Sequence, residues 1–213
     1  MSAIPRPTYG SASGHAPPAA AQPLAEYDLV VPQDARRALA RGWLWLGLIA
    51  LIGSGLFSIL LVLSRTPGIN QLLPAANFFH VSLVLHVDLS VLVWFVALGG
   101  LLWSLNGTPR GAGWGWIALW ITAAGTAAMS LAPFLDPGEP IMANYIPVLS
   151  SPLFLGGLVV FGLGVAVLVL RSMLSAPRLG FGFGGQGALH FGLNAAAVSM
   201  AVALLSFAWS YAV

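Results

Sequence analysis

Five long apolar stretches, separated by short polar segments, dominate the pattern of this chain. A helix needs about 20 apolar residues to cross the hydrocarbon core of a membrane, and each stretch is close to or above that length. Helix-breaking segments such as Arg65-Thr66-Pro67-Gly68 and Asp136-Pro137-Gly138 separate them. The expected helices cover approximately residues 43–63, 76–105, 113–135, 153–170 and 188–212. The pattern therefore predicts an all-α integral membrane protein with five transmembrane helices in a domain over residues 36–213.

Arginine placement predicts how the helices are oriented. With the N-terminus inside, seven of the eight arginines fall on the cytoplasmic side, and only Arg65 falls outside. The C-terminus is then outside. Residues 1–35 are rich in proline and alanine and poor in larger apolar residues, so we expect a disordered cytoplasmic tail.

Composition narrows the class of protein further. The chain is 58% hydrophobic and 7% charged, which no soluble domain of this length could bury, so its main partner is the lipid bilayer. A net charge of +2 gives no indication of a nucleic-acid partner. The chain has no cysteine, which excludes disulfides and thiolate metal sites within it.

Three ionisable residues interrupt the second apolar stretch: His80, His86 and Asp88. A charged group at the centre of a transmembrane helix costs roughly 2.5–3.5 kcal/mol, so such residues usually serve a function. Imidazole is also a common ligand of haem iron. At 100° per residue, His86 shares a face with Ser82, Ser90 and Val93. This face of small residues suits close approach by a porphyrin or by another helix, and His86 could be a haem ligand or a histidine hydrogen-bonded between helices.

The other polar residues of the spans point elsewhere. His80 lies about 120° around the helix from His86 and is a candidate neighbour of a haem propionate at the membrane surface. Asp88 lies about 160° from His86 and should face protein, where it could pair with another helix or carry protons. His190 begins the fifth stretch at the opposite membrane surface, so a second axial ligand would come from outside this chain.

The segment His86-Val87-Asp88-Leu89, followed by Val93-Trp94, resembles the second transmembrane helix of the catalytic subunit of haem-copper oxidases, and in particular the branch that includes nitric oxide reductases. The segment 135–149 also resembles the family's connection between its third and fourth helices. The resemblance implies that His86 is an axial ligand of a low-spin haem (haem b or haem a) near the outer face. It also implies a cytochrome c oxidase type of respiratory complex in a bacterial inner membrane.

Departures from the family suggest the N-terminal part of a split or truncated catalytic subunit. The other haem ligands and the copper-ligating histidines belong to later helices of the family, which have no counterpart here, and Asp88 replaces the more usual asparagine. The resemblance therefore implies a second membrane chain that carries the remaining helices and the copper, with a cytochrome c-type electron donor, and no oxygen reduction by this chain alone. Three alternatives stay open: a nitric oxide reductase component, a haem-free structural or assembly subunit, and a proton- or ion-translocating module that uses Asp88 and His80.

Overall fold

The computed structural model describes residues 31–73, 77–142, 146–177 and 185–212. In this part of the chain, five helices are long and apolar enough to cross a membrane, as the sequence predicts, and the protein is a multi-pass membrane protein by this criterion. The elements are α1 (Ala35–Ser64), the short 3-10 helix η1 (Asn70–Leu72), α2 (Phe78–Val87), the π-helix η2 (Asp88–Val93), α3 (Trp94–Asn106), α4 (Ala112–Leu135), β1 (Pro140–Ile141), β2 (Val148–Leu149), α5 (Pro152–Leu174) and α6 (Gln186–Ala212).

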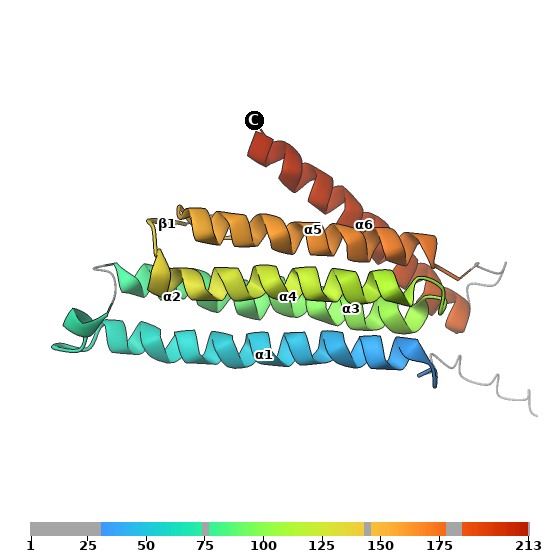
Figure 1. Cartoon of the computed structure of the whole chain (residues 1–213), viewed down its shortest axis with the longest axis horizontal. Coiled ribbons are helices and arrows are strands. Elements are labelled where there is room, and N and C mark those ends of the chain that lie inside the picture. Colours follow the sequence, from blue (N-terminus) through green and yellow to red (C-terminus); the bar gives the residue numbers. More distant parts are fainter. Residues whose placement is uncertain (1–30, 74–76, 143–145, 178–184, 213) are drawn as a thin grey trace, which may run out of the picture.

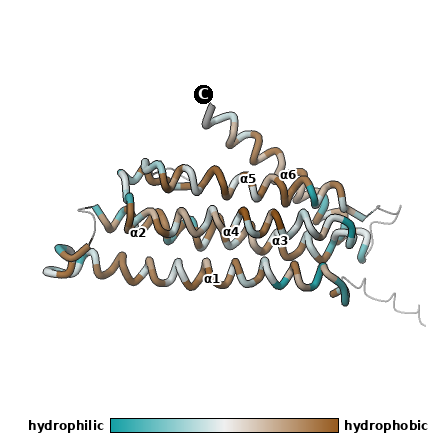
Figure 2. Tube along the Cα trace, viewed as in Figure 1, coloured by the Kyte–Doolittle hydropathy of each residue, from teal (hydrophilic) through white to brown (hydrophobic). Residues whose placement is uncertain are grey.

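The long helices run side by side, except for α6 (Figure 1). Helices α2, η2 and α3 are continuous and form the second span, from Phe78 to Asn106. Helix α6 starts near the end of α3, crosses α5 and then diverges from the bundle, so that little of its apolar surface is buried. Apolar residues occupy most of the length of the helices, and hydrophilic residues gather toward their ends (Figure 2). In the loop between α4 and α5, the two-residue strands β1 and β2 pair antiparallel, with Pro140 opposite Leu149.

Helix α1 begins earlier than the apolar pattern predicts, at Ala35 instead of near residue 43. Asp34 is the reason, because its carboxylate accepts a hydrogen bond from the backbone N–H of Arg36 at 2.9 Å and caps the helix. The arginine-rich first turns therefore extend the helix beyond the apolar run.

Glycines allow the helices to approach closely. A Cβ on Gly157 of α5 would lie 2.9 Å from the backbone nitrogen of Met129 in α4, and one on Gly125 of α4 would lie 2.7 Å from the carbonyl oxygen of Gly157. The α1–α3 contact is similar, because a Cβ on Gly100 would lie 2.5 Å from the ring of Trp43. Small residues at these contacts are typical of helix packing in membranes, where no hydrophobic effect drives helices together.

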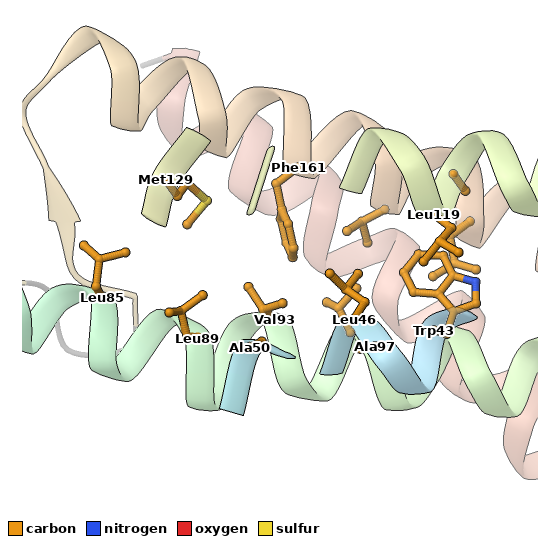
Figure 3. Close-up of a cluster of buried hydrophobic side chains, with 14 of the residues drawn as sticks. Trp43, Leu46, Ala50, Leu85, Leu89, Val93, Ala97, Leu119, Met129 and Phe161 are labelled. Atoms are coloured by element: carbon orange, nitrogen blue, oxygen red, sulfur yellow. The ribbon is translucent and has the colours of Figure 1, made fainter. Parts of the chain in front are cut away.

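A continuous core of buried side chains fills the space between the second span and its neighbours (Figure 3). Trp43 from α1 and Phe161 from α5 are among its large members, and both are almost fully buried. Its labelled residues are Trp43, Leu46, Ala50, Leu85, Leu89, Val93, Ala97, Leu119, Met129 and Phe161.

Candidate functional site

The second span changes its helical geometry two residues after His86. Residues Asp88–Val93 form a π-helix, with α-helix on both sides. A π-helix has i→i+5 hydrogen bonds and more residues per turn than an α-helix, so the faces predicted at 100° per residue no longer line up beyond Asp88. Short π segments inside α-helices occur frequently at functional sites.

Two hydrogen-bond acceptors on α1 hold the ring of His86. Its Nδ1 lies 3.0 Å from the carbonyl oxygen of Ser54 and 2.9 Å from the Ser54 hydroxyl. The same hydroxyl donates to the carbonyl oxygen of His86 at 2.9 Å, which uses its only hydrogen. A carbonyl oxygen can only accept, so Nδ1 must carry the ring proton. In the neutral ring, Nε2 then keeps its lone pair.

Ser90 provides a second hydroxyl at the backbone of His86. Its Oγ donates to the His86 carbonyl oxygen at 2.6 Å. Ser54 from another helix and Ser90 from the π segment thus converge on the same carbonyl oxygen. This pair fixes the backbone at the point where the helix changes geometry.

The residues predicted to share the His86 face separate into two groups. His86 and Ser90 are half-buried at the side of the bundle, next to α1. Ser82 and Val93 have no exposed surface and lie in the bundle interior, and the hydroxyl of Ser82 has no hydrogen-bond partner in the described part of the chain. The structure therefore brings Ser90 to His86 and places Ser82 and Val93 among the core residues.

Asp88 is buried in the protein, with 1% of its surface exposed. Neither carboxylate oxygen has a hydrogen-bond partner within the described ranges. An unpartnered buried carboxyl group is costly, whereas buried polar groups are normally hydrogen-bonded. Asp88 is therefore a second unusual feature of this span, separate from the hydrogen bonds that hold His86.

His80 lies outside the bundle, in the first turn of α2. Its Nδ1 is 2.5 Å from the side-chain oxygen of Asn77, and its ring meets that of Phe79 edge to face at 5.2 Å. The guanidinium of Arg65 lies over the same Phe79 ring, 3.8 Å from its centre. His80 is thus part of an exposed polar and aromatic cluster at one end of the second span.

His190 belongs to a polar contact at the opposite end of that span. Its Nδ1 is 2.5 Å from the side-chain oxygen of Asn106, whose amide nitrogen donates to the side chain of Asn194 at 3.0 Å. The indole N–H of Trp103 donates to the carbonyl oxygen of Leu193 at 2.9 Å. These bonds connect α3 to the first turns of α6. Among the described residues, no three His, Cys, Asp or Glu side chains are grouped as a metal site.

Two features of the site are absent from the sequence prediction: the π-helix and the role of Ser54. Ser54 does leave a trace in the sequence, because it stands between Gly53 and Gly55 in the middle of an apolar run. Small polar residues at such positions often contact another helix. The π segment has no comparable sequence signature.

The chain is similar to two longer proteins of bacteria. It is 39% identical over 67 residues to an uncharacterized protein of Rickettsia prowazekii (strain Madrid E), a match that covers 32% of this chain and 13% of the relative. It is 30% identical over 137 residues to an uncharacterized protein of Aquifex aeolicus (strain VF5), which covers 64% of this chain and 34% of the relative. The matches thus cover about an eighth and a third of these relatives. No protein-family model and no solved structure matches the chain.

Proposed function

We propose that this chain corresponds to the first five helices of a haem-copper oxidase catalytic subunit, in which Nε2 of His86 is an axial ligand of a low-spin haem. The observation that carries the proposal is the hydrogen bond from Nδ1 of His86 to the carbonyl oxygen of Ser54. Histidines that ligate metals almost always donate their other ring N–H to a carbonyl, carboxylate or water, which fixes the ring and raises the basicity of the ligating nitrogen.

The residues around His86 fit this role. The ring is anchored on one side by α1 and is half-buried, so that Nε2 can be reached from the side of the bundle. Ser54 and Ser90 hold the backbone of His86, and the neighbouring span residues supply an apolar surround. The resemblance of the segment from His86 to Trp94 to the family's second helix points to the same residue.

The haem, when bound, accepts and passes on single electrons. In the proposed complex His86 would hold the haem from this chain, and a second membrane chain would provide the other haem ligand, the remaining helices and the copper. This chain orients the His86 side chain as one ligand of the haem iron and shields that side chain from water. The reaction is reduction of oxygen with electrons from a cytochrome c-type donor, in a bacterial inner membrane with the N-terminus inside. Reduction of nitric oxide is the alternative within the same family.

A second candidate function is a haem-free structural or assembly subunit. One observation favours it: the bonds between His86 and Ser54 connect α1 directly to α2. In that case the histidine serves helix packing, as interhelical polar contacts in membranes often do.

The absorption spectrum of the chain, purified together with a membrane partner encoded beside it, distinguishes these functions. We expect a low-spin haem spectrum that disappears in His86→Ala and persists in His190→Ala, because His190 is bonded to Asn106 at the other end of the span. If the chain is instead a haem-free structural or assembly subunit, no haem copurifies with the wild type or with either variant.

A further inference from the structure

The arginine that ends α1 has a free charge next to the start of α2. Arg65 is exposed and is the C-cap residue of α1. Among the described residues the one ion pair joins Arg36 to Asp34, so neither Asp136 nor Glu139 is paired with Arg65. A guanidinium carries five N–H donors and stays charged in proteins. Arg65 can therefore bind a carboxylate that comes from outside this chain.

An aromatic ring holds the guanidinium of Arg65 beside the second span. The central carbon of the guanidinium lies 3.8 Å from the centre of the Phe79 ring. Phe79 is half-buried in the first turn of α2, at the end of the bundle where α1 ends (Figure 1). Cations are attracted to the face of an aromatic ring. The contact thus keeps the positive charge of Arg65 against α2.

Phe79 and His86 lie on one flank of α2. They are seven residues apart in a regular α-helix, which places them about 20° apart around its axis and about 10.5 Å apart along it. Leu83 lies between them on this flank, and all three side chains are half-buried. His80, in contrast, is exposed and lies about 120° around the helix from His86. The positive group beside this flank is therefore Arg65, and His80 lies away from it.

Helix α1 presents one face to this flank. Ser54, which holds the ring of His86, precedes Arg65 by eleven residues, and at 100° per residue the two are about 20° apart around α1. The Ser54–His86 hydrogen bonds and the Arg65–Phe79 contact are thus two levels of the same interface between α1 and α2. A ligand bound at His86 and extending along this interface reaches Arg65.

We propose that Arg65 binds a propionate of the haem whose iron His86 ligates. This inference rests on the proposed function. A haem carries its propionates on one edge of the macrocycle, and the distance from the iron to their carboxylates is comparable to the rise from His86 to Phe79. Leu83 and Phe79 give the macrocycle an apolar surface, and the guanidinium fork of Arg65 matches a carboxylate in a bidentate pair. The propionate edge then faces the end of the bundle where α1 ends and α2 begins.

Redox titration of the full chain, purified with its membrane partner, tests the proposal. Reduction adds an electron to the haem, so a positive charge nearby favours the reduced form. In Arg65→Gln we expect the ratio of reduced to oxidised haem at a fixed potential to fall roughly tenfold, as a unit charge about 10 Å away gives at an effective dielectric constant of about 20. A tenfold change corresponds to about 59 mV for a one-electron couple. Arg65→Lys keeps the charge and should restore most of the wild-type potential.

Arg110→Gln is the matched control. It removes the same charge from an exposed residue in the loop between α3 and α4, at the opposite end of the bundle, and should leave the potential unchanged. An unchanged potential in Arg65→Gln, with a normal low-spin spectrum, would overturn this inference and leave the proposed function standing. Equal shifts in Arg65→Gln and Arg65→Lys would also overturn it, because the effect would then not come from the charge. Absence of low-spin haem from the wild type would overturn both.

A second measurement keeps the test valid if Arg65→Gln does not fold. The ammonium of a lysine cannot form the bidentate pair that a guanidinium forms. Resonance Raman spectra of Arg65→Lys should therefore show a shifted propionate bending band, whereas His80→Gln should show the wild-type band. A wild-type band in Arg65→Lys would overturn the inference.

Discussion

Ser54 of α1 holds both the ring and the backbone of His86. Its carbonyl oxygen accepts the ring N–H at 3.0 Å, and its hydroxyl donates to the carbonyl oxygen of His86 at 2.9 Å. Ser54 thus fixes both the tautomer of His86 and the position of the His86 backbone relative to α1. This relationship orients the ring of His86, whereas His80 is exposed.

Replacing Ser54 by alanine removes the hydroxyl and leaves its backbone carbonyl in place. We expect the free energy of unfolding to fall by about 1 kcal/mol, because a hydrogen bond between helices is lost. Haem retention should weaken roughly tenfold, in the range found when a group that orients a metal ligand is removed. Titration of unfolding with SDS and haem content per protein measure the two effects. Ser64→Ala is the control, since the one bond of its hydroxyl within the described ranges is to Leu61 of its own helix, and equal haem loss in both variants would contradict the role of Ser54.

Replacing Asp88 by asparagine should stabilise the protein. The carboxyl group is buried without a hydrogen-bond partner in the described residues, and an amide of the same shape avoids the cost of burying a charge. We expect the free energy of unfolding to rise by about 1–2 kcal/mol, with haem content unchanged. Asp136→Asn, in the loop after α4, should change neither quantity. Loss of haem in Asp88→Asn would instead give this residue a role in the haem site.

The close contact between α4 and α5 should make Gly157 sensitive to the smallest side chain. Its Cβ would lie 2.9 Å from the backbone nitrogen of Met129, which cannot move without displacing α4. We expect Gly157→Ala to lower the free energy of unfolding by about 1–3 kcal/mol, as overpacking does. Gly156→Ala is the matched control, because no atom lies within 4 Å of its Cβ position. Equal stability of the two variants would mean that the helices are not this close.

The start of α1 should loosen in acid. The side-chain and backbone hydrogen bonds from Arg36 hold the pKa of Asp34 below its usual value. Because the pKa is lower in the folded chain, the cap is at full strength above about pH 4 and is lost as the pH falls through the folded pKa. Amide hydrogen exchange at Arg36 and Arg37, corrected for its intrinsic rate, should therefore rise in acid. Asp34→Asn should remove most of this pH dependence, and an unchanged pH profile in that variant would contradict it.

The pattern of apolar residues predicts the five spans because length and hydropathy alone decide whether a helix can cross a membrane. It also separates His86 from Asp88, because two residues along an α-helix place their side chains about 160° apart. It cannot predict the faces beyond Asp88, because the period of the helix changes there without a sequence signal. The partner of His86 is equally hidden, since Ser54 reaches it only through the packing of two helices.

Nor does the sequence reveal which arginine is buried. Arg171 reads as one of several cytoplasmic arginines, and only the packing of α5 against the first turn of α4 removes it from water. Burial of this kind depends on neighbours that are distant along the chain.

The most direct test of the haem proposal is the spectrum of His86→Gly, purified with its partner, before and after addition of imidazole. Removal of the side chain leaves space beside Ser54 for a free imidazole, which can restore the missing ligand. We predict loss of the low-spin haem signal in visible absorption and electron paramagnetic resonance, and its return with imidazole. A low-spin signal that persists in His86→Gly without imidazole would contradict the assignment of His86 as the ligand.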